Sequence, residues 1–175
     1  MIKTLLADIL VTIVMAALIF AGVHCTLEQC IVHQVSMLPS LKEGQRIFIN
    51  KITYHLHTPD RGDIIVFKLT DSADDVPLIK RVIGLPGETI EIKSGLVYVC
   101  GSALEEPYVN ECPNYVLKPF VVPESQYFVL GDNRNMSNDS HYGWTVPVEN
   151  IMGKAWISIW PPDDWGLVPA CTYAQ

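Results

Sequence analysis

The sequence has no run of basic residues, no internal repeat and no low-complexity linker, and its 175 residues carry a formal net charge of −7. An acidic chain without a basic stretch lacks the electrostatic footprint of a nucleic-acid-binding surface. Its length suffices for one domain with a hydrophobic core and an attached segment. We therefore exclude nucleic acid as a partner and expect one folded domain.

The five cysteines include no Cys-x-x-Cys pair, so the spacing that marks a zinc site is missing. Cys100 and Cys112 could form a disulfide in an oxidising compartment, or they could be buried free thiols. His55 and His57 would share one face of a strand, but no third ligand is evident. We expect no metal or cofactor, and an exposed histidine pair.

Only one long hydrophobic run is present, over residues 5–23, and Asp8 is its single charge. As a helix it would be about 28 Å long, close to the ~30 Å hydrocarbon core of a bilayer. A cleaved signal peptide is the alternative, but Ala21-Gly22-Val23 is a poor cleavage site. Residues 1–26 are therefore predicted to be a retained transmembrane anchor. Lys3 and the α-amine favour a cytoplasmic N-terminus.

Short apolar and β-branched segments separated by turn residues follow the anchor, which predicts a mainly β fold in residues 27–175. We expect a compact antiparallel β-sheet domain behind the transmembrane helix, with a hairpin turn at Ser94-Gly95. Residues 71–75 should be an acidic loop, 101–118 an excursion without pattern and 161–175 an irregular tail. The predicted strands are 31–35, 46–51, 63–68, 78–85, 89–93, 96–100, 126–130 and 151–160.

Lys80 and Arg81 lie in the middle of an apolar predicted strand that ends at Pro86-Gly87. Neighbours on a strand point to opposite faces, so the two cations cannot share one environment. Burial of Lys80 among apolar side chains would lower its pKa and make the neutral amine available as a general base. The alternative is that both cations reach solvent or form structural ion pairs.

Ser36 follows the first predicted strand, and Pro39 stiffens the turn after it. A hydroxyl fixed at such a turn, near a free backbone N–H, is what a nucleophile with a local oxyanion hole requires. Ser-x-x-Pro is also a common turn. None of the five histidines has an evident orienting carboxylate, whereas a desolvated lysine can serve as base without one.

Residues 131–144 form a polar, turn-prone loop after a strand. Such side chains can bond their own backbone and build a rigid loop that presents a hydroxyl to a buried amine and a counter-charge to Arg81. A solvated surface loop is the alternative. We predict solvated surface also for Asp60-Arg61 and for Glu105-Glu106.

Together these stretches resemble the type I signal peptidases, membrane-bound serine proteases that remove signal peptides from exported proteins. The resemblance extends from the anchor to about Trp160, and four motifs in family order are highly specific behind one membrane span. They are Ser-Met-Leu-Pro at 36–39, Arg-Gly-Asp-Ile-Ile-Val-Phe at 61–67, Lys-Arg-Val-Ile-Gly-Leu-Pro-Gly at 80–87, and Gly131-Asp132-Asn133-Arg134 followed by Ser137, Asp139 and Ser140.

The resemblance implies a role for each matching residue. Ser36 would be the nucleophile, Lys80 its general base, and Ser137 the serine that hydrogen-bonds and orients the lysine amine. Asp132, Arg134 and Asp139 match structural ion-pair positions of the loop, with Arg81 as the partner of Asp132. The pockets for small side chains at −1 and −3 of the cleavage site would be lined by Val32, Met37, Leu41, Leu78 and Ile79.

Two positions depart from the family pattern. Gln34 stands where many members have serine, whose hydroxyl completes the oxyanion hole, or glycine, so only the Ser36 backbone N–H is predicted as an oxyanion donor. His141 replaces the usual arginine and would pair fully with Asp139 only when protonated. The large inserted domain of some bacterial members is absent.

The resemblance implies cleavage of signal peptides after small residues, without cofactor, by a mainly β enzyme to which the substrate adds a strand. The expected partners are preprotein signal peptides and the lipid bilayer, and the expected location is a bacterial plasma membrane with the catalytic domain outside the cytoplasm. A mitochondrial inner membrane is the other location considered. A peptidase for a restricted substrate set and a catalytically silent partner subunit are the alternatives. The oligomeric state is left open.

Overall fold

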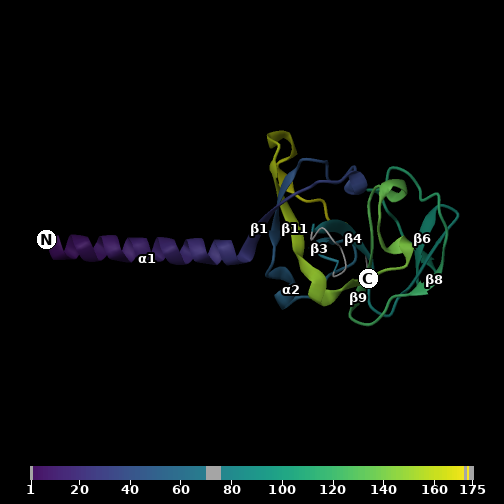
Figure 1. Cartoon of the computed structure of the whole chain (residues 1–175), viewed down its shortest axis with the longest axis horizontal. Coiled ribbons are helices and arrows are strands. Elements are labelled where there is room, and N and C mark those ends of the chain that lie inside the picture. Colours follow the sequence, from purple (N-terminus) through teal and green to yellow (C-terminus); the bar gives the residue numbers. More distant parts are fainter. Residues whose placement is uncertain (1, 70–75, 172, 174–175) are drawn as a thin grey trace.

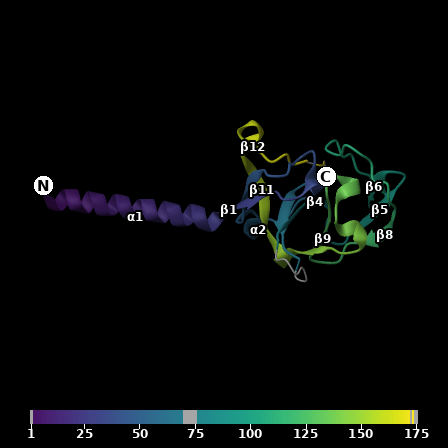
Figure 2. The ribbon, with the colours of Figure 1, turned by 45° about the horizontal axis from the view of Figure 1, so that its top comes forward.

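A long straight helix, α1 (Ile2–Thr26), projects from a β domain that contains the other described elements (Figures 1 and 2). The computed structural model describes residues 2–69, 76–171 and 173, and the side chains of all of these except 2, 3, 5–7 and 25. The predicted acidic loop at 71–75 lies outside the described residues.

The helix predicted over residues 5–23 is present as part of α1, and its apolar side chains, such as Leu10, Leu18 and Phe20, are exposed. Within the described residues, no helix has the length and the apolar character that a bilayer crossing requires, so the predicted span is not found there.

The strands of the described residues form two antiparallel sheets. The larger has the order β1-β2-β11-β3-β4-β9-β10, with β12 paired to β11, and the smaller has the order β7-β6-β5-β8. The strands of the larger sheet are β1 (Leu27–Ile31), β2 (Arg46–Asn50), β3 (Ile64–Phe67), β4 (Leu78–Gly84), β9 (Gln126–Leu130), β10 (Val146–Pro147), β11 (Ile151–Trp160) and β12 (Gly166–Leu167). The smaller sheet consists of β5 (Thr89–Lys93), β6 (Leu96–Val99), β7 (Ser102–Ala103) and β8 (Leu117–Val121).

Short helical turns connect these strands. They are α2 (Thr53–Leu56) and the 3-10 turns η1 (Val35–Met37), η2 (Arg134–Met136), η3 (Ser140–Tyr142), η4 (Val148–Asn150) and η5 (Pro162–Asp164).

Strand β4 is the centre of the core because it contributes to all three apolar clusters. Ile79 packs in the cluster of β2 and β3, Val82 in the cluster on the opposite face, and Ile83 in the cluster between the two sheets. A strand buried on both faces has a continuous apolar sequence, which is why the predicted strand at 78–85 is correct to one residue.

The predicted mainly β fold is confirmed, and so are most of its strands. The predictions at 89–93, 126–130 and 151–160 match β5, β9 and β11 at both ends. The hairpin between β5 and β6 is also present, and Ser94 and Gly95 have φ of 52° and 75°, as a type I′ turn requires.

Several local predictions are wrong. The strand at 31–35 is wrong because β1 ends at Ile31 and the chain then turns into η1. His55 lies in α2, and His57 follows it, so the pair shares no strand face. The predicted excursion and tail contain β7, part of β8 and β12.

The cysteines whose side chains are described, Cys30, Cys100, Cys112 and Cys171, are all free. Cys112 packs against Gly95, where an added Cβ would lie 3.2 Å from the Cys112 Cβ. Cys100 follows the other end of β6, about 16 Å from Gly95 at ~3.3 Å per residue along the strand. A disulfide needs Cα atoms within about 7 Å, so the Cys100–Cys112 disulfide is wrong. Both residues are exposed, so the alternative of buried free thiols is wrong as well.

Candidate active site

Ser36 lies in the middle of η1, directly after an extended stretch in which Gln34 has φ −132° and ψ 153°. The Leu38 N–H donates to Val35 O at 3.2 Å and closes the turn. Only 5% of Ser36 is exposed. The short turn therefore holds the serine hydroxyl in a buried position, although the strand predicted to carry it is absent.

Lys80 reaches Ser36 from β4. Its Nζ donates to Ser36 Oγ at 2.8 Å and to the Ile79 carbonyl at 3.0 Å, and the residue is 1% exposed. Strand β9 pairs with β4 from Arg81 onward, so in the described residues the preceding edge of β4 has no strand on that side. Turn η1 lies beside β4, which brings Ser36 within reach of the lysine amine.

Burial lowers the pKa of Lys80 from 10.5 to about 8, although the charges of Asp139 and Asp132 act in the opposite direction. Desolvation disfavours the ammonium form because a low-dielectric site solvates a charge poorly. At pH 7 roughly a tenth of the amines would be neutral, and this form can accept the Ser36 proton. The pair thus has the geometry and the basicity of a nucleophile with its general base.

Ser137 does not make the predicted hydrogen bond to Lys80. Its Oγ is buried and has no hydrogen-bond partner among the described residues. The hydroxyl lies against Gly131, where a Cβ would collide with Ser137 Oγ and with the Ser36 carbonyl oxygen. Ser137 therefore borders the backbone of Ser36, and glycine at 131 is what allows the two to approach.

The polar loop is hydrogen-bonded to the backbone of Ser36, and several of its side chains are buried, so the solvated-loop alternative is wrong. The Asn133 N–H donates to the Ser36 carbonyl at 3.0 Å, and Asp139 Oδ2 accepts from the Gly131 N–H at 2.9 Å. Asp139 also contacts His141 Nδ1 through Oδ1 at 2.6 Å.

The expected ion pair of Arg81 with Asp132 is present and bidentate. Arg81 Nε and Nη2 donate to the two carboxylate oxygens at 2.8 and 2.7 Å, and both side chains are at most 1% exposed. Burial alone would lower the pKa of Arg81, but the hydrogen-bonded Asp132 carboxylate raises it above its ordinary value. The cation beside Lys80 therefore stays charged.

Sequence reasoning missed the partner of Arg134. Its two Nη atoms donate to Glu106 at 2.6 Å each, and the Glu106 side chain is 9% exposed, so the prediction of solvated surface is wrong there. Arg61 is likewise a largely buried partner of Glu88. A buried arginine requires a carboxylate, but no local pattern indicates that Glu106, 28 residues away, supplies it.

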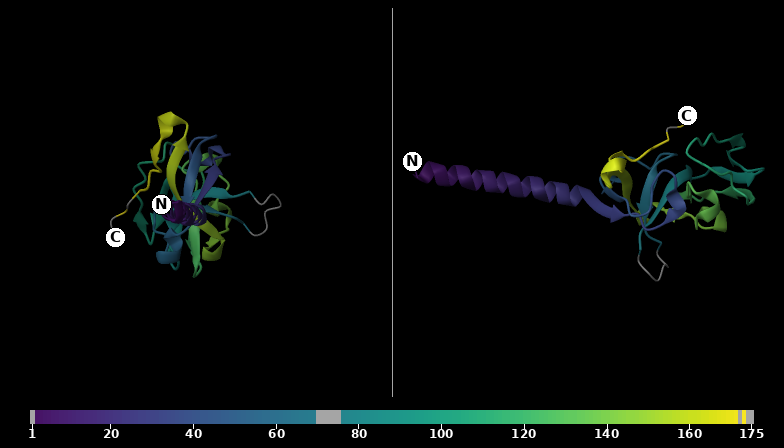
Figure 3. Two further views of the ribbon diagram at one scale, coloured as in Figure 1. Left: turned by 90° about the vertical axis from the view of Figure 1, so that its left-hand side faces the viewer. Right: turned by 90° about the horizontal axis from the view of Figure 1, so that it is seen from above.

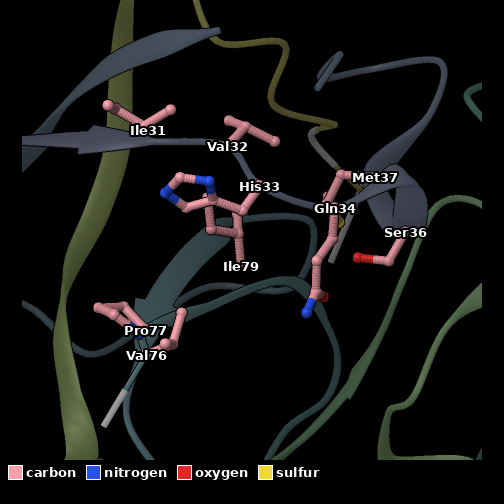
Figure 4. A pocket seen from close by; sticks show the side chains of 9 residues that line it. All are labelled: Ile31, Val32, His33, Gln34, Ser36, Met37, Val76, Pro77 and Ile79. Atoms are coloured by element: carbon pink, nitrogen blue, oxygen red, sulfur yellow. The ribbon is translucent and has the colours of Figure 1, made fainter. Parts of the chain in front are cut away.

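A small pocket lies beside Ser36, between the extended stretch after β1 and the edge of β4 (Figure 4). Ser36 Oγ points into the space beside Gln34, and the free volume is about 20 Å³. Of the five predicted substrate-contacting residues, Val32, Met37 and Ile79 line this pocket. Leu41 is buried in the same apolar cluster but does not line it, and Leu78 packs, half-buried, against the cluster on the opposite face. The lining residues that the prediction omitted are Ile31, His33, Val76 and Pro77.

Residues 4–160 match a protein family described as signal peptidase, peptidase S26. The chain belongs to the S26 signal peptidase family. The probable signal peptidase I-1 of Synechocystis sp. is 45% identical over 144 residues, which are 79% of this chain and 74% of that protein. Signal peptidase I of Leptolyngbya laminosa is 45% identical over 145 residues, 79% of this chain and 71% of that protein. A solved signal peptidase I from Enterococcus faecalis V583 has a TM-score of 0.47 and 36% identity, over 56% of this chain and 97% of that one.

Proposed function

We propose that this S26 family member is an endopeptidase that removes signal peptides from exported preproteins by cleaving after small residues. The observation that carries the proposal is the 2.8 Å contact of a buried lysine amine, with its pKa near 8, with the hydroxyl of a buried serine. The family and its signal peptidase relatives supply the substrate class.

In the proposed reaction, Lys80 takes the Ser36 proton as Oγ bonds to the carbonyl carbon of the scissile peptide. The Ser36 backbone N–H donates to the oxyanion. Lys80 then returns the proton to the departing amine, the C–N bond breaks, and an acyl-enzyme remains. A water molecule, deprotonated by Lys80, attacks the ester, and the carboxylic product leaves as Ser36 regains its proton.

The pocket supports a small side chain next to the scissile bond. The pocket has room for about one water molecule, roughly 20 Å³, which favours a side chain as small as a methyl group. The groove between residues 31–34 and the open edge of β4 can receive an extended peptide as an added strand. Both features favour an Ala-x-Ala type of site.

The test is cleavage of a secretory precursor with an Ala-x-Ala site by the purified full-length protein, with the product identified by its N-terminal sequence. We expect cleavage at that site by the wild type and none by Ser36→Ala. A precursor with leucine at −1 should be cut at least about 100-fold more slowly. Cleavage that persists in Ser36→Ala would contradict the nucleophile. A folded wild type that cleaves no precursor would favour the silent-subunit alternative.

We also propose that α1 attaches the enzyme to a bacterial cell membrane, with the N-terminus in the cytoplasm and the catalytic domain outside. The support is the exposure of apolar side chains such as Leu10, Leu18 and Phe20, which lipid would cover. The wild type should float with lipid vesicles and resist carbonate extraction, whereas Leu10→Glu/Leu18→Glu should not. Flotation lost in carbonate would indicate surface attachment, and a protease-accessible N-terminus on intact cells would reverse the orientation.

A further inference from the structure

The chain beyond β12 returns across the domain toward the active-site loop. Figure 3 shows this yellow segment leaving the end of β11 and β12 and running toward the smaller sheet. Val168 is buried, and its N–H donates to the Trp156 carbonyl at 2.9 Å. We call residues 168–171 and 173 the closing segment.

The closing segment packs tightly on the turn before β3. A Cβ placed on Gly62 would collide with the Cys171 carbonyl oxygen, and Gly62 has φ +93°. The Gly62 carbonyl accepts from Arg81 Nη1 at 2.8 Å. The same Nη1 lies 3.3 Å from the Pro169 carbonyl. The segment therefore forms one wall around the buried cation that follows Lys80 in the chain.

Tyr108 forms the next wall and links the segment to the second buried cation. Its ring lies 4.0 Å from Arg81 Cζ, and its hydroxyl lies 2.7 Å from the Tyr173 hydroxyl. The Tyr108 hydroxyl also donates to Glu106 Oε1 at 2.8 Å. Glu106 in turn binds both Nη atoms of Arg134.

Arg134 completes the connection to the nucleophile. Its Nε donates to the Gly131 carbonyl at 3.1 Å, and Gly131 lies against the Ser36 backbone. The next two residues of the loop bind Arg81 and Ser36. Asp132 accepts from Arg81, and the Asn133 N–H donates to the Ser36 carbonyl. A continuous set of contacts thus joins the closing segment to Ser36.

The charges in this set balance, because Arg81 pairs with Asp132 and Arg134 pairs with Glu106. All four side chains are at most 9% exposed. Ion pairs of this kind keep one geometry only while water is excluded and every donor is matched. The closing segment covers Arg81, and its Pro169 carbonyl and Tyr173 hydroxyl supply two of the contacts in this set.

From these contacts we infer that the closing segment is a positioning element for the Ser36–Lys80 pair. It excludes water from the Arg81–Asp132 ion pair, holds Tyr108 and Glu106 in place, and thereby keeps the loop from Gly131 to Asp139 against Ser36. The residues after Val168 contact Arg81, Gly62 and Tyr108, none of which lines the pocket beside Ser36, so their loss should act on catalysis and not on substrate binding. This inference deepens the proposed function and rests on it.

The experiment compares the full chain, a chain ending at Val168, a control chain ending at Tyr173, and Tyr173→Phe, which should retain the fold. Precursor cleavage gives kcat and KM, and amide hydrogen exchange reports on residues 131–139. For the chain ending at Val168 we expect kcat to fall at least tenfold, KM to stay within about threefold, and loop exchange to rise at least tenfold. Tyr173→Phe should lower kcat about threefold, and the control chain should match the full chain.

Unchanged loop exchange and kcat in the shortened chain would overturn the inference. So would faster exchange throughout both sheets with kcat per folded molecule unchanged, because that is the result of a purely structural segment. Unaltered kcat and loop exchange in Tyr173→Phe would remove Tyr173 from the set. The exchange measurement needs no substrate, so a full chain that cleaves no precursor would contradict the proposed function while the positioning role is still measured.

Discussion

Lys80→Met should reduce kcat/KM for precursor cleavage by at least about 10³-fold, because a thioether cannot accept the Ser36 proton. The wild type should show activity that rises with pH through an apparent pKa of about 8, where the buried amine loses its proton. The measurement is kcat/KM between pH 6 and 10 for both proteins. Met is similar in length to Lys, so the core around the site should remain filled.

Lys80→Arg serves as the matched control, since it keeps the cation and the hydrogen-bonding capacity but cannot act as a base. It should be as inactive as Lys80→Met. If either variant retains activity within tenfold of the wild type, the base is another group, and His33 would be tested next because it lines the pocket.

Lys80→Met should also make the protein more stable at neutral pH. The unfolded chain binds a proton on Lys80 up to pH 10.5, whereas the folded chain releases it above about 8. Folding therefore disfavours the proton, and this cost is fully present below pH 8 and disappears as the pH rises through 10.5. Lys80→Met should raise the free energy of unfolding at pH 7 by up to about 3 kcal/mol, and less at pH 10. Equal stability of both proteins at pH 7 would contradict this account.

Asp132→Asn should lower the free energy of unfolding by about 3–5 kcal/mol and abolish precursor cleavage. The change leaves the Arg81 guanidinium without a counter-charge at a site where the arginine side chain is 1% exposed. Arginine cannot escape by deprotonation. Urea unfolding at pH 7 measures the loss, and hydrogen exchange at residues 131–139 locates it.

Glu28→Gln is the control for this prediction, because its ion pair with Lys51 is at the surface, with 44% of the Glu28 side chain exposed. Its free energy of unfolding should change by less than about 1 kcal/mol. A double variant, Arg81→Met with Asp132→Leu, should recover part of the stability of Asp132→Asn but none of the activity. A loss in Asp132→Asn no larger than that in Glu28→Gln would show that Arg81 finds another partner or water.

The candidate site shows how far a sequence can specify function. Local context makes Ser36 and Lys80 candidates, through a stiff turn for the serine and an apolar strand for the lysine. The resemblance to the type I signal peptidases is what implies their roles as nucleophile and base. The loop is predicted to present a hydroxyl to the lysine, but Ser137 lies beside the backbone of Ser36 instead. A motif position gives the residue type, but it does not determine which way a buried hydroxyl points.

Elements with little apolar periodicity are the ones that the sequence does not reveal. Strand β8 contains Lys118 and Pro119 and is mostly exposed, so its sequence has no alternation to detect. The true position of β1 depends on pairing with β2, residue by residue from Leu27 opposite Asn50. Such pairing is a long-range property, and the apolar residues at 31–35 indicate the wrong segment.

The sequence alone determined the β character of the domain and the apolar N-terminal helix, because periodicity is local, and its family motifs made Ser36 and Lys80 the predicted nucleophile and base. Tertiary structure decided which groups meet. Ser36 and Lys80 are 44 residues apart, Arg134 and Glu106 are 28 apart, and Arg81 and Pro169 are 88 apart. These contacts arise from sheet order and from the path of the closing segment, and burial that lowers the pKa of Lys80 exists only once the strands have packed.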